Sequence, residues 1–206
     1  MMNKMNLPHL ITVTSFVVFI VLGLACATTE PNQSGTQRRL YSAEDYTDRA
    51  GVHLDNKRYD LAIDDCNEAI RLSPKNSLAY FVRAYAYSGK GDYDLAINDY
   101  TEVIRLSPPN PAPVYNARAW TYAYYMKTNF DQAIADATQA IRLERNEANY
   151  YDTRGWAYLG KGDYNRANDD FIKALQLDRN LESSREGLGK IREAQAEEVI
   201  DWSEFE

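Results

Sequence analysis

The chain has 206 residues, 45% of them hydrophobic and 26% charged, and its formal net charge is −7. An acidic chain without a Lys/Arg-rich run is a poor ligand for nucleic acid, because phosphate neutralisation supplies most of that affinity. Two cysteines and two histidines are too few for a metal site or a disulfide framework. We therefore expect a globular domain with no nucleic-acid partner, no metal and no small-molecule cofactor.

The N-terminus is typical of a secretory signal. Lys4 precedes an uncharged apolar stretch from residue 10 to residue 25, and small residues follow it. A permanent membrane span needs about 20 apolar residues, so this stretch is short for one, although an uncleaved anchor is an alternative. We assign residues 1–25 to the signal peptide.

The sequence LGLAC, which ends at Cys26, resembles the lipobox of bacterial lipoproteins. The resemblance implies that Cys26 is lipidated and anchors the protein to a membrane. The alternative is cleavage after residue 27, at the small-x-small sequence ACA, which would release a soluble protein. Residues 26–42 are polar and contain Pro and Gly, as in a flexible tether. In either case we expect an exported protein of the bacterial cell envelope, in the periplasm or at the cell surface.

A similar sequence motif then occurs four times. The copies begin at Tyr59, Tyr93, Phe130 and Tyr164, at spacings of 34, 37 and 34 residues. This period resembles the tetratricopeptide repeat (TPR), a 34-residue helix–turn–helix unit. The resemblance implies an all-α fold, a right-handed superhelix of four helical hairpins with a C-terminal capping helix. The units are residues 43–76, 77–110, 112–147 and 148–181, with Pro111 as a linker residue and two extra residues in the turn near 124–128.

Small residues stand at the two positions of each unit where the family needs close helix packing. They are Ala50, Ala84, Ala119 and Gly155 at position eight, and Ala62, Ala96, Ala133 and Ala167 at position twenty. The turns agree with this interpretation. Gly91 and Gly162 suit the left-handed residue that ends a helix, and Asp92 and Asp163 suit the N-cap of the next helix.

Every unit also has an arginine at position seven and an aspartate at position twenty-three. The arginines are Arg49, Arg83, Arg118 and Arg154, and the aspartates are Asp65, Asp99, Asp136 and Asp170. The helices of a hairpin are antiparallel, so these positions lie roughly opposite each other. We predict a ladder of Arg–Asp pairs, within units or between neighbours, that has a structural role rather than a ligand-binding one.

Repeat arrays bind ligands along their concave face, and the TPR resemblance implies that positions two, five, six, nine, twelve and thirteen line it. Position nine gives the aromatic series Tyr85, Trp120 and Trp156. Aromatic stripes at helical spacing are often core, but position nine lies outside the predicted packing set, which favours a binding surface. The candidate groove residues are Phe81, Tyr85, Asn116, Trp120, Tyr124, Asn149, Asp152 and Trp156. Such a groove suits an extended or helical peptide, or the sugar rings of a glycan.

Residues 182–206 contain one more helical pattern and an acidic tail. The pattern predicts the capping helix that covers the last apolar face of a repeat array. The tail carries Trp202 and Phe205. It is a frayed end, a short partner-binding segment, or a segment that folds back into the groove.

No constellation of residues in the sequence indicates catalysis. The Gly-rich stretch 88–92 lies in a helix–helix turn and lacks P-loop spacing, and no base is placed beside a Ser or Cys nucleophile. His53 and Cys66 occupy packing positions. We therefore expect a non-enzymatic scaffold that binds a protein or peptide partner. A structural or self-associating assembly factor and a glycan-binding accessory protein are the alternatives.

Overall fold

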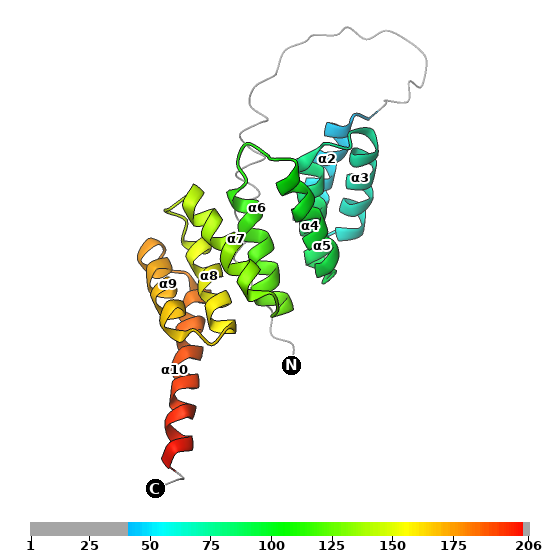
Figure 1. The fold of residues 1–206 in the computed structure, drawn as a ribbon. Coiled ribbons are helices and arrows are strands. Elements are labelled where there is room, and N and C mark those ends of the chain that lie inside the picture. Colours follow the sequence, from blue (N-terminus) through cyan, green and yellow to red (C-terminus); the bar gives the residue numbers. More distant parts are fainter. Residues whose placement is uncertain (1–40, 204–206) are drawn as a thin grey trace, which may run out of the picture. The chain divides into compact units, whose positions relative to one another are not determined.

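The computed structural model describes residues 41–203, with side chains as far as residue 196. All regular secondary structure in this range is helical (Figure 1). The predicted all-α fold is therefore confirmed. The signal peptide, Cys26 and the tether up to residue 40 lie outside the described residues.

The helices form antiparallel pairs along the chain (Figure 1). The first helices of the pairs are α2 (Ala43–Asp55), α4 (Ser77–Lys90), α6 (Ala112–Trp120) and α8 (Ala148–Gly160). The second helices are α3 (Tyr59–Leu72), α5 (Tyr93–Arg105), α7 (Phe130–Leu143) and α9 (Tyr164–Leu177). A last helix, α10 (Glu182–Ser203), packs against α8 and α9 in the place expected for the capping helix.

Small residues let the two helices of each pair approach closely, as predicted. The alanines at positions eight and twenty are all 0% exposed, and Gly155 is buried. A Cβ atom on Gly155 would stand 2.7 Å from the ring of Phe171 on α9, which is too close for any side chain. The hairpin packing thus depends on the absence of side-chain volume at these sites.

The turns between paired helices follow the predicted chemistry with one exception. Gly91 and Gly162 have φ angles of 88° and 77°, the left-handed conformation that favours glycine. The side chain of Asp163 caps α9 by accepting from the backbone N–H of Arg166 at 3.2 Å. Asp92 occupies the equivalent N-cap position of α5 but makes no side-chain capping bond, so that part of the prediction is wrong.

The third unit takes up its two extra residues in a π-helical segment, η3 (Thr121–Met126), which directly continues α6. A π-helix places more residues in each turn than an α-helix, and such segments are frequent at functional sites. Lys127 and Asn129 then both adopt left-handed backbones, with φ near 50°, before α7 begins. The widened turn carries Tyr124 and Tyr125, which enter the site described below.

The junction between the second and third units differs from the others. The backbones of the first helices α2 and α4 lie close together, as do those of α6 and α8, whereas the backbones of α4 and α6 lie farther apart. This junction depends instead on contacts of α5 with α6 and with η3. The connection from α5 to α6 contains Pro108, Pro109 and Pro111, and Ser107 has a left-handed backbone with φ 51°. The left-handed backbone of Ser107 and the two prolines that follow it prevent α5 from continuing as a helix.

Candidate functional site

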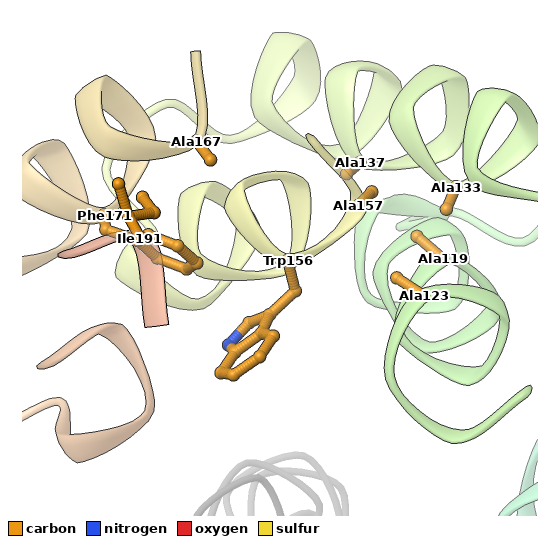
Figure 2. Packing of buried hydrophobic residues seen from close by; sticks show 9 residues of the cluster. All are labelled: Ala119, Ala123, Ala133, Ala137, Trp156, Ala157, Ala167, Phe171 and Ile191. Atoms are coloured by element: carbon orange, nitrogen blue, oxygen red, sulfur yellow. The ribbon is translucent and has the colours of Figure 1, made fainter. Parts of the chain in front are cut away.

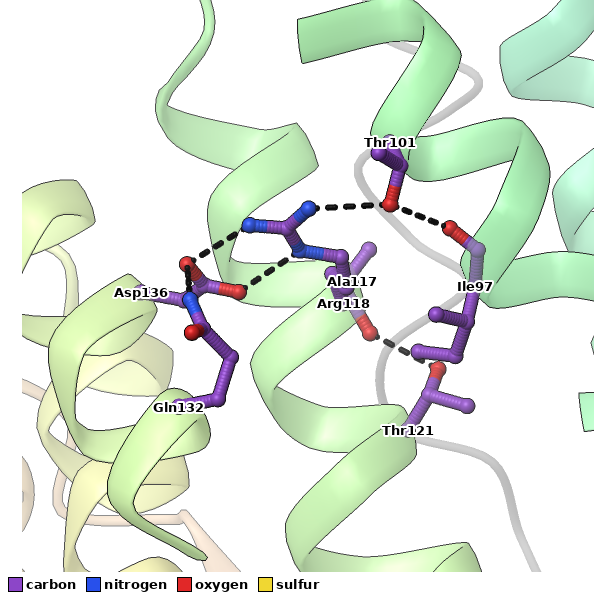
Figure 3. A network of polar contacts seen from close by, with 7 residues as sticks. All are labelled: Ile97, Thr101, Ala117, Arg118, Thr121, Gln132 and Asp136. Atoms are coloured by element: carbon purple, nitrogen blue, oxygen red, sulfur yellow. Dashed lines mark hydrogen bonds and ion pairs between the residues drawn. The ribbon is translucent and has the colours of Figure 1, made fainter. Parts of the chain in front are cut away.

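Arg118 shows how the predicted Arg–Asp ladder is built (Figure 3). Its Nε and Nη2 donate to the two carboxylate oxygens of Asp136 at 2.7 and 2.9 Å, and its Nη1 donates to Thr101 Oγ1 in the preceding unit at 2.9 Å. Thr101 Oγ1 donates in turn to the backbone carbonyl of Ile97, and Gln132 Nε2 donates to Asp136. The guanidinium therefore joins its own hairpin to the neighbouring one.

The same bidentate pair occurs in each of the four units, which confirms the prediction. Arg49 pairs with Asp65, Arg83 with Asp99 and Arg154 with Asp170, at N–O distances between 2.5 and 2.8 Å. Arg83 and Arg154 also donate to Asn67 and Thr138 of the preceding unit. Because these guanidinium groups are held by protein partners, the ladder links hairpins and does not offer cations to a ligand.

Among the predicted groove residues, those of the second unit form an edge-to-face cluster. The rings of Phe81 and Tyr85 on α4 lie 4.9 Å apart, and both meet the buried ring of Tyr100 on α5, at 6.1 and 5.9 Å. These distances are typical of favourable aromatic pairs. The cluster packs against Val114 and Ala117 of α6, and burial raises the pKa of Tyr85 to about 12. The rings thus form part of the junction between the second and third units.

The third unit contributes a stacked pair. The Trp120 and Tyr124 rings lie 4.3 Å apart and nearly parallel, at 10°. Tyr125 contacts both rings edge-on and stacks on Tyr93 of α5, with centroids 4.8 Å apart. Neither Tyr93 nor Tyr125 is predicted from the sequence as a site residue. The two-residue insertion marks this segment, but the contact of Tyr125 with α5 requires the π-helical turn.

Trp156, in the fourth unit, belongs to the core. It is 8% exposed and lies in the buried cluster with Phe171 and Ile191 (Figure 2). Its Nε1 donates to Ser183 Oγ of α10 at 3.1 Å, and the Tyr124 ring meets it edge-on at 5.2 Å. The expectation that position nine lies outside the packing set is therefore wrong for Trp156, because the capping helix covers it.

Asp152 is 0% exposed beneath the same helix. Its carboxylate accepts hydrogen bonds from Ser184 Oγ at 2.6 Å and from Ser183 Oγ. Burial raises the pKa of Asp152 to about 6, against the opposing effect of the two serine hydroxyls. With α10 in place a ligand has no access to this carboxylate. In the structure Asp152 and Trp156 therefore hold α10 against α8.

Asn116 and Asn149 lie on α6 and α8 and are half-buried. Within the described part of the chain, the buried Oδ1 of Asn116 accepts no hydrogen bond. The backbone carbonyl of Asn149 accepts from Thr153 Oγ1 at 2.8 Å. Ligand binding by these residues stays a prediction.

Four half-buried aromatic rings on the first helices and η3 form the surface that we call the aromatic face. They are Phe81, Tyr85, Trp120 and Tyr124.

The described residues were compared with the requirements for a metal site and for a membrane-spanning helix. Between residues 41 and 203, no three His, Cys, Asp or Glu side chains lie close enough to hold a metal ion. No helix in the same range is long and apolar enough to cross a bilayer.

An open polar pocket of about 490 Å³ lies beside Tyr164, Asn165 and Gln195 of α9 and α10. This pocket shares no residue with the aromatic face.

Paired helices stacked at a 34-residue period define a TPR array, and comparison with known families agrees. Family models of the tetratricopeptide repeat match residues 46–76, 66–98 and 148–181. The family models therefore support tetratricopeptide repeats in these stretches, which lie in the first, second and fourth units. No curated protein matches the chain.

Solved TPR structures resemble this fold. YrrB, described as "a TPR protein with an unusual peptide-binding site", is 15% identical, with 75% of this chain covering 78% of YrrB at a TM-score of 0.63. MamA is 18% identical, with 71% of this chain covering 84% of it at 0.63. The first TPR of Spaghetti (RPAP3), bound to the HSP90 peptide SRMEEVD, is 28% identical, with 58% of this chain covering 93% of it at 0.53.

Proposed function

We propose that this protein is a non-enzymatic scaffold that binds a peptide segment of a partner protein on its aromatic face. The stacked pair of Trp120 and Tyr124 is the observation that carries the proposal. Both side chains remain partly accessible on the first-helix side, and their orientation is fixed by Trp156 and Tyr125. Aromatic side chains held rigidly in this way lose little entropy on binding and are enriched in hot spots.

The comparisons support a peptide as the ligand. A peptide is bound by the RPAP3 domain, and the description of YrrB names a peptide-binding site. The only cysteine among the described residues, Cys66, is not poised as a nucleophile, since it is fully buried and burial raises the pKa of its thiol to about 12. A binding role is therefore the simplest account of the chain.

We also propose that the scaffold works at the bacterial cell envelope, held to a membrane by a lipid on Cys26. The support is the apolar stretch from residue 10 to residue 25 and the LGLAC sequence that ends it. Mass spectrometry of the mature N-terminus tests this. We expect an acylated Cys26, and a free N-terminus at residue 28 or an intact residue 1 would contradict it.

The binding role is tested by affinity capture from membranes of the organism that encodes the protein. The full-length chain in detergent is compared with the double variant Trp120→Ala/Tyr124→Ala. Leu95→Ala is the control, because Leu95 is a 46% exposed apolar residue on the second helix α5. Trp156 is left unchanged because its truncation would open the core.

We expect a partner protein that is retained by the parent chain and by Leu95→Ala and is lost from the double variant. Circular dichroism must show that all three chains are folded. If a folded double variant retains the partner, the aromatic face is not the binding surface. Retention of glycan without protein would favour the glycan-binding alternative.

A further inference from the structure

The charged residues at the ligand-facing positions of the first helices are predominantly acidic when α10 is counted as a fifth first helix. The exposed acidic residues are Glu44, Asp48, Asp55, Glu186 and Glu193, Asp152 is acidic but buried by α10, and the single basic residue is Lys190. Lys190 has its charge partner on the same helix, with Nζ 3.6 Å from Glu186 Oε1, and both side chains are about half exposed. An exposed pair of this kind stabilises little.

The arginines of the first helices do not offset this negative charge. Arg83, Arg118 and Arg154 are mostly buried, and each donates two hydrogen bonds to an aspartate of its own hairpin. These charges are neutralised toward the second helices. The ligand side of α4, α6 and α8 therefore has rings and acceptors but no free guanidinium.

Helix α10 brings a carboxylate to the side of the stacked pair. The Tyr124 ring meets Trp156 edge-on at 5.2 Å, and Trp156 donates to Ser183, which precedes Glu186 by one helical turn on α10. In agreement with this placement, burial and the carboxylates of Glu186 and Asp152 raise the pKa of Tyr124. Asp152 accepts hydrogen bonds from two serine hydroxyls and makes no ion pair with any described residue, and the carboxylate of Glu186 contributes to raising its pKa. The buried Oδ1 of Asn116, on the same face two turns before Tyr124, is a further acceptor without a donor among the described residues.

We propose that the aromatic face selects a cationic peptide segment, with an Arg or Lys side chain lying on the Trp120–Tyr124 stack beside Glu186. The proposal rests on the peptide-binding function proposed above and specifies its ligand. Aromatic faces attract cations, and a nearby carboxylate adds Coulomb attraction.

The same charges disfavour acidic segments. The peptide SRMEEVD, which the RPAP3 domain binds, ends in acidic residues and would meet more carboxylates than cations here, since Lys190 is the single basic residue at these positions and is paired with Glu186. The chain's own C-terminal sequence, EEVIDWSEFE, is acidic too. Like-charge repulsion therefore opposes its binding to this face, and a basic partner segment is the occupant that charge complementarity supports.

Three pools of fluorescein-labelled random nonapeptides test the proposal, with Arg, Gln or Glu fixed at the central residue. Binding to the full-length chain in detergent is measured by fluorescence anisotropy at low and at high NaCl concentration. We expect the Arg pool to bind about tenfold more tightly than the Gln pool, with the Glu pool weakest. The preference should decrease as salt rises.

Two variants separate the contributions. Trp120→Leu keeps an apolar surface but removes the aromatic ring, so it should abolish most of the Arg preference. Glu186→Gln, at an exposed site that leaves the fold intact, should reduce the Arg preference several-fold and leave binding of the Gln pool unchanged. Asp64→Asn, the same loss of charge at an exposed site on α3, should change nothing.

The outcomes distinguish the preference for a cationic peptide from peptide binding on the aromatic face, on which that preference rests. Equal binding of the three pools, lost in Trp120→Ala/Tyr124→Ala, would overturn the cationic ligand and leave the peptide-binding face standing. Tightest binding of the Glu pool would also overturn it. If no pool binds the folded chain, both the ligand class and the peptide-binding face are wrong.

Discussion

The guanidinium of Arg118 has two structural tasks, since it neutralises Asp136 within its hairpin and donates to Thr101 of the hairpin before. The side chains of Arg118 and Asp136 are only 13% and 4% exposed. A carboxylate buried to this degree is costly when its partner is removed, whereas replacing both partners by apolar groups costs much less. The pair is thus a sensitive probe of how the hairpins are joined.

Arg118→Leu should lower the free energy of unfolding by about 3–5 kcal/mol, because it leaves Asp136 charged and unpaired. The double variant Arg118→Leu/Asp136→Leu should lose clearly less than the sum of the two single changes. Urea unfolding followed by circular dichroism measures this. Arg49→Leu, at an arginine that is 44% exposed, should cost less than Arg118→Leu. Strictly additive losses would contradict the pairing.

Asp152 should make stability depend on pH in an unusual direction. Burial raises its pKa from 3.8 to about 6, so between these values the folded state keeps a proton that the unfolded state has lost. The contribution of Asp152 to the free energy of unfolding therefore falls by up to ~3 kcal/mol as pH rises from about 4 to about 6. Above about pH 6 this contribution stays constant. Asp152→Asn should lack this change.

The measurement is the difference in unfolding free energy between the parent chain and Asp152→Asn at several pH values from about 4 to 7. Subtraction removes the contributions of other carboxylates. The difference should fall with rising pH. A difference that stays constant over the whole range would show that Asp152 titrates normally.

For individual residues, the sequence predicts the structural residues that recur in every unit better than it predicts the residues of the candidate site. The Arg–Asp pairs and the small packing residues are found because each recurs in every unit, and recurrence separates them from chance. Trp156 occupies the same repeat position as Tyr85 and Trp120, yet it is buried. Its burial depends on α10, a neighbour that follows the last complete unit, so the repeat position alone cannot show it.

Among the elements, α10 and η3 shape the site most. Helix α10 lies over α8 and α9 through Gly187, because a Cβ atom there would stand 2.3 Å from the Phe171 ring. Two residues later, a Cβ atom on Gly189 would meet nothing within 4 Å. Gly187 is therefore required for the packing of α10 on Phe171, whereas Gly189 has room for a side chain.

Gly187→Ala should destabilise the protein by about 1–3 kcal/mol by pushing α10 off Phe171. Gly189→Ala should instead stabilise it by up to ~1 kcal/mol, since alanine is the better helix former and finds open space. Thermal melts with tryptophan fluorescence, which reports on Trp156 beneath α10, measure both. Equal effects of the two changes would show that α10 is not packed as described.

The π-helical segment explains why part of the site is missed from the sequence. A count of residues reveals the two-residue insertion, but it does not tell whether the extra residues lengthen the loop or widen the helix. Widening places Tyr125 against Tyr93 of the preceding unit, with stacked rings at 9°. This contact helps to join units whose first helices, α4 and α6, have backbones that lie farther apart than those of the other neighbouring first helices.

For the whole molecule, the fold class follows from the 34-residue period because each hairpin must bury its apolar faces against the next. The identity of the ligand cannot be predicted from this period. The repeats specify packing, and the residues that we propose for binding, Tyr85, Trp120, Tyr124 and the carboxylates around them, are ones whose surroundings differ between units. Membrane attachment depends on residues outside the described range and stays a prediction from the N-terminal sequence.

The most direct measurement of the central claim is site-specific photo-crosslinking of the full-length chain in cells that produce it. Either Tyr124 on the aromatic face or Leu95 on α5 is replaced by p-benzoylphenylalanine. The account predicts a covalent adduct with a partner protein from position 124 and none from position 95. Adducts from position 95 alone, or equal adducts from both, would contradict the claim that the aromatic face binds the partner.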